Sequence, residues 1–285
     1  MATPKLKKNV ADEELLDEVL TPEERAPVYN SRIEVNADGE TEVFDLLAGY
    51  EDSDGVLHKT FTLREMTGRD EEAISKSDLR QNGGKLISTL LERCVQSIGT
   101  LTRKEVGTDK WKDIIKSLFV GDQDYILIKL RELSMGGEIE VNHTCPHCKN
   151  SMKTFLDVSE LEIKPFQGNR VVEFELPKGY RDKKGVVHRS GKMKLPTGLD
   201  REILTPMARK NLAQASTLML TRLCKFDDEG VYVTEDVMRD LTVRDREYLQ
   251  KLLQDNLFGV NLEIPVTCTE CGEEFTGNLN TTNFI

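Results

Sequence analysis

The chain has 285 residues, of which 38% are hydrophobic and 31% charged, and its formal net charge is -11 at pH 7. This length allows two domains, each with a core of its own. No apolar run reaches the roughly 18 residues that a membrane span needs, and the first residues lack the apolar stretch of a signal peptide. The negative charge repels phosphate backbones and argues against nucleic acid as a partner. We therefore expect a globular protein of a reducing cytoplasm with no membrane partner.

Residues 1–40 are predicted to form a flexible, acidic N-terminal arm, because their composition lacks the pattern of a packed core. Within this arm, Ala11–Leu20 places leucine and valine side chains among acids at helical spacing. A helix this short is marginal in isolation. The segment therefore either frays or docks on a partner as an amphipathic helix.

Residues 41–167 carry strand patterns, then helix patterns, then strand patterns again. Two strands joined by a turn-rich link predict a hairpin. Thr67 is followed by acids that suit a capped first helical turn, and Gly136 with Gly137 ends the last helix. In order, the expected elements are strands 43–47 and 57–63, helices that begin near 67, 85, 109 and 122, and strands 138–144 and 152–158.

The same pattern recurs in the second half of the chain, and we interpret this as a tandem duplication. Phe44 and Phe174 are 130 residues apart, and the separation falls to 123 residues after a shorter loop at Asp227–Tyr232. The second unit is predicted to span 168–285 and to be related to the first by a pseudo-twofold axis. Further matches include Thr67 with Thr197, Asp70 with Asp200, Cys94 with Cys224, Asp122 with Asp245 and Tyr125 with Tyr248.

The order of these elements predicts the fold class α+β. Each unit is expected to contain a hairpin, a layer of about four helices and a second hairpin that holds a pair of cysteines. The two units would then form a body of two lobes with the cysteines near the shared axis.

Cys145 and Cys148 form one C-x-x-C pair, and Cys268 and Cys271 form another at the matching place in the second unit. Each pair supplies half of the tetrahedral shell of a structural zinc ion, and in a reducing compartment this spacing favours metal over disulfides. If the two units bring the pairs face to face, one closed shell per chain results, and the zinc would hold the units together. Two alternatives remain open: a shell completed by another subunit, and pairs that bind nothing.

The histidines are not required for this site. His143 and His147 lie at the first cysteine pair, but their counterparts in the second unit are Val266 and Glu270. A site built on the repeat therefore needs neither ring as a ligand.

Other recurring residues are expected to have structural roles. His58 and His188 recur within the hairpins and are predicted to be hydrogen-bonded structural histidines. Cys94 and Cys224 lie on apolar helix faces and are predicted to be buried core thiols.

No nucleophile elbow, phosphate-binding loop, zinc-protease motif or dinucleotide-binding motif is present in the sequence. Pairs of acids lie at predicted helix starts, where capping and the helix dipole explain them. The sequence therefore predicts a protein that is not an enzyme, with no catalytic residues and no organic cofactor.

Two stretches resemble proteins of tailed bacteriophages. Phe61–Glu72, a strand that runs into a capped helix, resembles the opening of tail assembly chaperones. Cys145–Cys148 followed by Phe155–Glu162 is similar to the baseplate hub and assembly proteins of T-even-type contractile-tailed phages.

This resemblance implies a non-enzymatic structural or assembly protein that acts in tail or baseplate-hub morphogenesis. Its expected partners are the tape-measure, tube or baseplate-hub proteins, with the arm docking on one of them. Its expected location is the host cytoplasm during assembly and then the tail or baseplate of the virion. The alternative is a zinc-ribbon module that binds nucleic acid or a transcription complex, which would require a basic face.

Overall fold

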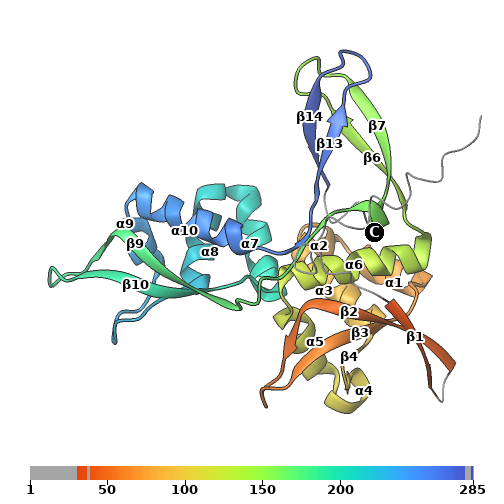
Figure 1. The fold of residues 1–285 in the computed structure, drawn as a ribbon, viewed down its shortest axis with the longest axis horizontal. Coiled ribbons are helices and arrows are strands. Elements are labelled where there is room, and N and C mark those ends of the chain that lie inside the picture. Colours follow the sequence, from red (N-terminus) through yellow and green to blue (C-terminus); the bar gives the residue numbers. More distant parts are fainter. Residues whose placement is uncertain (1–30, 37–38, 280–283, 285) are drawn as a thin grey trace, which may run out of the picture.

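The computed structural model describes residues 31–36, 39–279 and 284. Figure 1 shows three lobes: a first lobe of residues 31–135, a second lobe of residues 171–256, and a third lobe of two hairpins, residues 138–157 and 263–278, that project away from the other two. The predicted N-terminal helix at Ala11–Leu20 lies outside the described residues.

The first lobe is built on a five-stranded antiparallel sheet. Alternate residues of its long central hairpin face the core, where the rings of Phe44 and Phe61 stack with their centroids 5.2 Å apart. The strand order is β1-β2-β3-β4-β5, with β1 (Ser31–Asn36), β2 (Gly39–Glu51), β3 (Leu57–Leu63), β4 (Val95–Ile98) and β5 (Leu101–Thr102).

Helices cover one face of this sheet and supply most of its core. Trp111, Tyr125 and Phe61 are its largest fully buried side chains, and they anchor the helices because large apolar groups gain most from leaving water. The helices are α1 (Gly68–Ile74), α2 (Ser77–Arg80), α3 (Gly83–Cys94), α4 (Arg103–Val106), α5 (Thr108–Ser117) and α6 (Val120–Met135).

The second lobe repeats this plan with fewer strands. Its sheet has the order β11-β10-β9, and its separate core is centred on Phe174, Met193 and Phe226. Its elements are β9 (Val171–Arg181), β10 (Val187–Lys194), α7 (Gly198–Lys210), α8 (Leu212–Leu223), β11 (Cys224–Phe226), α9 (Glu235–Asp240) and α10 (Val243–Asn256).

The two lobes share an aspartate-centred cluster at the start of a helix. In each lobe a threonine and an aspartate form a capping box, and an arginine Nε from the following long helix donates to the buried aspartate over 2.7 Å. The members are Thr67, Asp70 and Arg93 in the first lobe and Thr197, Asp200 and Arg222 in the second.

A second shared contact joins a helix to the long strand of each lobe. Asp122 of α6 accepts the backbone N–H of Ala48 over 3.1 Å, and Asp245 of α10 accepts the backbone N–H of Lys178 over 2.7 Å. Both aspartates are fully buried. Each carboxylate therefore satisfies strand donors that have no strand partner.

Paired histidines also recur, as the sequence indicates. His58 lies 3.0 Å from a carboxylate oxygen of Asp52, and His188 lies 2.7 Å from one of Asp228. The expectation of hydrogen-bonded histidines is met, although the acids that partner them were not foreseen. The hydrogen bond to Asp228 raises the pKa of His188.

The third lobe takes one hairpin from each half of the chain. Below it, β8 (Ile163–Lys164) pairs with β12 (Gly259–Val260), and the 3-10 turn η1 (Val158–Glu160) follows the first hairpin. The hairpins are β6 (Glu138–Thr144) with β7 (Ser151–Asp157), and β13 (Glu263–Thr267) with β14 (Glu274–Asn278).

The end of the second half packs on the first lobe, and glycines permit this approach. A Cβ on Gly121 would lie 2.4 Å from the carbonyl oxygen of Phe258, and one on Gly259, whose φ is +120°, would lie 2.7 Å from the Gly121 Cα. Helix α6 and strand β12 can therefore touch only without side chains there.

The elements predicted from the sequence are present, but their grouping differs. The fold class α+β is confirmed, and the predicted strands and helices of the first unit correspond to β2, β3, α1, α3, α5, α6, β6 and β7. Residues 31–36, inside the predicted arm, form β1. The cysteine hairpins leave their own halves and come together in the third lobe, because only paired do they bury their apolar sides.

Burial of Asp122 predicts a specific pH effect. Desolvation raises its pKa to about 6, above the usual value near 3.9, so the folded state binds the extra proton and gains stability as the pH falls from 7 towards 4. Asp122→Asn should remove this gain, so from pH 7 to pH 4 the free energy of unfolding of the variant should fall by up to about 3 kcal/mol relative to that of wild type. Urea unfolding at several pH values measures this difference in stability, and Asp109→Asn, at an exposed position, is the control. A difference in unfolding free energy between Asp122→Asn and wild type that does not change with pH would contradict the prediction.

Candidate metal centre

The two cysteine turns have the same backbone conformation. In the first turn, the N–H of Cys145 donates to the carbonyl of Asn150 over 2.9 Å, and the N–H of Lys149 donates to the carbonyl of Cys145 over 3.0 Å. In the second turn, the N–H of Cys268 donates to the carbonyl of Glu273 over 2.8 Å, and the N–H of Gly272 donates to the carbonyl of Cys268 over 3.0 Å. The residue after each pair has a positive φ, 62° at Lys149 and 71° at Gly272, so the chain reverses tightly enough for both thiols to point to the same side.

The third lobe brings all four sulfurs together. Cys145 Sγ lies 3.8 Å from Cys271 Sγ, and Cys148 Sγ lies 3.6 Å from Cys268 Sγ. All four sulfurs lie within 4.8 Å of one another. The four residues singled out in the sequence thus form one cluster, with each close pair joining the two halves of the chain.

These distances suit a tetrahedral metal ion. Zinc binds thiolates at about 2.3 Å, and the corners of such a tetrahedron are about 3.8 Å apart. The close pairs, at 3.6 and 3.8 Å, match that edge and are far longer than the roughly 2.05 Å of a disulfide. All six cysteines are free thiols. The cluster is therefore compatible with a metal site.

The ionisation of the thiols also favours a cation. The backbone N–H groups of Cys271 and Glu270 point at the Cys268 sulfur and lower the pKa of this thiol to about 6. The N–H of Glu273 lowers the pKa of Cys271, but desolvation and the neighbouring thiols outweigh it and raise that pKa to about 12. One thiolate forms readily and the next ones repel it, so a divalent cation is needed to ionise all four.

The cluster closes the end of a small apolar core. Cys145 and Cys268 are buried with Met152 and Val266, and Phe275 packs beside them. This core has very few members, and two-stranded hairpins are marginal alone. A metal bond between the hairpins would stabilise an assembly that apolar packing alone stabilises weakly.

Neither nearby histidine belongs to the cluster, which contains only cysteines among the described residues. The ring of His143 packs edge-on against Phe275, and burial lowers its pKa. Nearby lysines are engaged elsewhere: Lys149 donates to the carbonyl of Pro146, and Lys153 pairs with Glu140.

The other residues singled out in the sequence are distant from this cluster. Cys94 and Cys224 are buried in the first and second lobes, as predicted, and burial raises their pKa values to about 11 and about 12. Such thiols stay protonated and act as small apolar groups.

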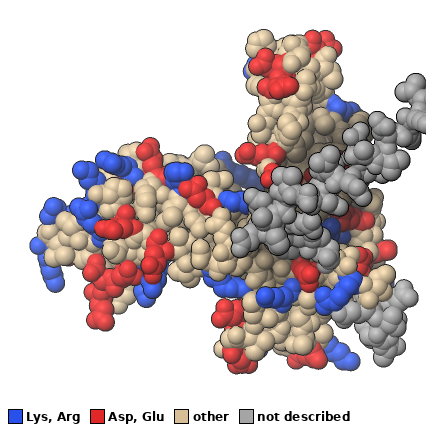
Figure 2. Space-filling view, viewed as in Figure 1, with Lys and Arg blue, Asp and Glu red and all other residues tan. Residues whose placement is uncertain are grey.

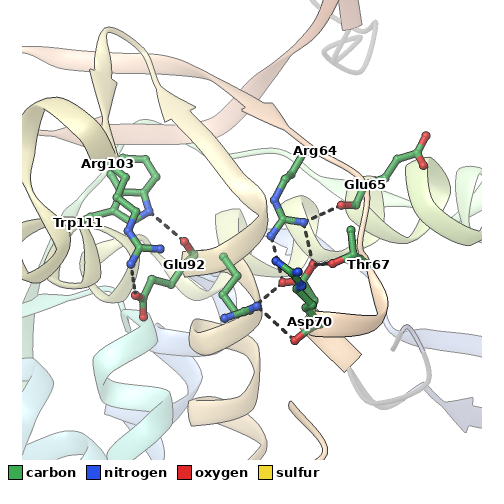
Figure 3. Close-up of polar contacts among 9 residues, drawn as sticks. Arg64, Glu65, Thr67, Asp70, Glu92, Arg103 and Trp111 are labelled. Atoms are coloured by element: carbon green, nitrogen blue, oxygen red, sulfur yellow. Dashed lines mark hydrogen bonds and ion pairs between the residues drawn. The ribbon is translucent and has the colours of Figure 1, made fainter. Parts of the chain in front are cut away.

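A groove on the outer face of the first-lobe sheet collects basic side chains that the sequence analysis did not anticipate. They come from β1, from the residue that follows β3, and from α3 and α4, so no local motif marks them. Arg93 binds the buried Asp70. Arg64 binds it too (Figure 3) and in particular holds the pKa of that carboxyl well below its usual range. The groove is lined by Arg32, Arg64, Arg93, Arg103 and Lys104, together with Glu92 and polar residues of the sheet.

Acids of the chain itself balance much of this charge. Arg103 lies 3.8 Å from Glu92, whose carbonyl accepts the indole N–H of Trp111 (Figure 3). On the face drawn in Figure 2, acidic side chains border the row of basic ones on the first lobe. The nucleic-acid alternative requires a broad unpaired basic surface, and this groove provides little of one.

None of the helices in the described part of the chain combines the length and apolar character that a bilayer crossing requires.

Comparison with known families defines the class of protein. A family model described as "T4 bacteriophage base plate protein" matches residues 53–284, which include both C-x-x-C pairs and all three lobes apart from β1 and β2. The chain is a phage baseplate protein. More particularly, it belongs to the T4 bacteriophage base plate protein family. No curated protein and no solved structure matches it.

Membership in this family implies contacts with other phage structural proteins and a place in the virion tail or baseplate. The resemblance noted in the sequence is thus confirmed at the level of the baseplate.

Proposed function

We propose that this protein acts without catalysis in assembly of the phage tail or baseplate hub, and that one structural zinc ion, bound by Cys145, Cys148, Cys268 and Cys271, holds its two halves together. The observation that carries the proposal is the convergence of four sulfurs, two from each half, within 4.8 Å. A shell of four thiolates is closed, so such a zinc has no position for water or substrate.

The shared contacts of the two lobes support a tandem duplication. Asp70 and Asp200 bind arginines from corresponding helices, and Asp122 and Asp245 bind corresponding strand amides. Contacts of this kind depend on several residues far apart in sequence, so chance similarity of composition is a poor explanation. On this proposal the units are 41–167 and 168–285, following the arm of residues 1–40, and the zinc joins their equivalent hairpins.

The physical role of the zinc would be to make the third lobe rigid. A protein that organises larger partners must hold its binding surfaces in a defined arrangement, and a metal-linked pair of hairpins resists separation better than a small apolar core. The proposed partners are the tape-measure, tube or baseplate-hub proteins. The proposed location is the host cytoplasm during assembly, and the N-terminal arm would dock on one of these partners.

The proposal is tested by metal analysis together with complementation. The purified chain should contain one zinc per molecule, and a phage that lacks this protein should regain tails with complete baseplates when the wild-type gene is supplied. Variants with serine at two cysteines should fail to restore complete baseplates under electron microscopy. Full restoration by a zinc-free variant would refute the structural role of the metal.

A further inference from the structure

The second lobe leaves open a strand edge that the first lobe covers. In the first lobe, β1 pairs with residues 39–44 of β2. Among the residues that the structure describes, the corresponding strand of the second lobe, β9, is the last strand of its sheet and pairs only with β10. The residues that precede β9 instead form β8, which pairs with β12 at the junction of the lobes.

Hydrogen bonds show which groups of β9 face this edge. The N–H of Leu195 donates to the carbonyl of Arg170, so the backbone groups of Arg170 and of every second residue after it point toward β10. The N–H of Glu175 points the other way and meets the hydroxyl of Tyr248 over 3.5 Å. By this alternation, the backbone groups of Val171 and Glu173 face outward, and no described group binds them.

Both ends of this open stretch are protected. At one end, Arg170 donates to the carbonyls of Ala48 and Gly49 in the first lobe. At the other, Asp245 of α10 binds the Lys178 N–H, and Pro177 has no N–H to offer. Natural proteins protect sheet edges in these ways, so the short gap at Val171–Glu173 stands out as the unprotected part.

The first lobe shows which side chain suits such an edge. There Arg32 of β1 lies opposite Val43, and its guanidinium reaches Asp45 over 3.5 Å. The residues of β9 that match Val43 and Asp45 are Glu173 and Glu175, both exposed. A basic side chain placed like Arg32 would therefore face two carboxylates instead of one, although Glu173 also lies 3.8 Å from the exposed Lys192 of β10.

We propose that the edge of β9 at Val171–Glu173 accepts an extended segment of another baseplate protein as an added strand, with a lysine or arginine opposite Glu173. Backbone hydrogen bonds to Val171 and Glu173 would provide affinity, and the pair of glutamates would select a basic segment. This docking surface is independent of the zinc.

The test uses the full-length protein and a short capped peptide with the β1 sequence, in which lysine replaces the glutamate. Binding is measured by titration, and hydrogen exchange reports on individual amides. The amides of Val171 and Glu173 should exchange fast in the free protein, and the peptide should protect them. A peptide N-methylated at alternate residues should not bind.

Variants of the edge make the test specific. Val171→Pro removes an N–H that does not pair with β10 and should weaken binding at least ~10-fold, equivalent to about 1.4 kcal/mol. Lys183→Pro, at the tip of the same hairpin, is the matched control and should bind normally. Because a proline variant can disturb folding, Glu173→Lys with Glu175→Lys provides a second route: it should lose the basic peptide and gain one with glutamates at the basic positions.

Three results would overturn the proposal. These are no binding at millimolar peptide, binding that all edge variants retain, and protection of amides elsewhere. Sedimentation of the protein alone distinguishes a further occupant, since self-association that Val171→Pro abolishes would assign the edge to a second copy of this chain instead.

Discussion

Serine at both Cys145 and Cys148 should leave the purified protein without the proposed zinc ion and without a stable third lobe. Two thiolates cannot hold a structural zinc, and apparent binding free energies of such sites are about 10–16 kcal/mol in zinc-finger peptides. The small core around Met152 and Val266 cannot replace a contribution of that size. Metal analysis should fall from one equivalent to none, and hydrogen exchange of β6, β7, β13 and β14 should accelerate greatly.

The matched control is Cys224→Ala, which removes a buried thiol of the second lobe. It should lower stability by a few kcal/mol at most, as for other small cavities in a core, and should retain a full equivalent of zinc. Retention of zinc by the Cys145 and Cys148 double variant would show that the ion binds elsewhere.

The second large effect is expected from Asp70→Asn. The side chain of Asp70 is fully buried and binds Arg64, Arg93 and Thr67. An amide keeps the shape but leaves two guanidinium groups without their counter-charge. Breaking such a buried pair costs about 3–5 kcal/mol, and because both arginines are about one-third exposed we expect about 3 kcal/mol in urea unfolding. Asp78→Asn, at an exposed ion pair, should change stability by less than about 1 kcal/mol.

The same cluster predicts the response to acid. The guanidinium of Arg64 lowers the pKa of Asp70 in the folded state. The contribution of Asp70 to stability is therefore complete above its pKa in the unfolded state, near 3.9, and it is lost as the pH falls through its pKa in the folded state. Wild type and Asp70→Asn should differ most at neutral pH and converge in strong acid. A difference that is constant with pH would contradict this account.

The sequence predicted best those features that depend on neighbouring residues. Thr67 with Asp70 marks a capped helix, alternating residues mark β6 and β7, and each C-x-x-C turn has the backbone conformation that brings its two thiols together. These are interactions over a few residues, so local pattern is enough to find them. Internal matches between the halves then indicated that the two cysteine pairs occupy equivalent places.

Features that depend on distant residues were not predictable in this way. The basic groove draws on Arg32 of β1, Arg64 just after β3 and Arg103 of α4, and no spacing links them. Strand β1 lies in a stretch with the composition of an arm and is a strand because β2 pairs with it. The pKa of Asp122 is set by its burial under β2. The sequence shows only an acid at the start of a helix and does not indicate that burial.

By itself, the amino-acid sequence determined the α+β class, the positions of most helices and strands, and the four cysteines, because capping, alternation and C-x-x-C turns are local. Only the tertiary structure decided that the two cysteine hairpins form a lobe apart from the units that carry them, and that no described segment pairs with the outer edge of β9 while β1 covers that of β2. Both outcomes depend on which surfaces meet across more than a hundred residues, where the burial of apolar area and the pairing of backbone groups are settled by the whole chain.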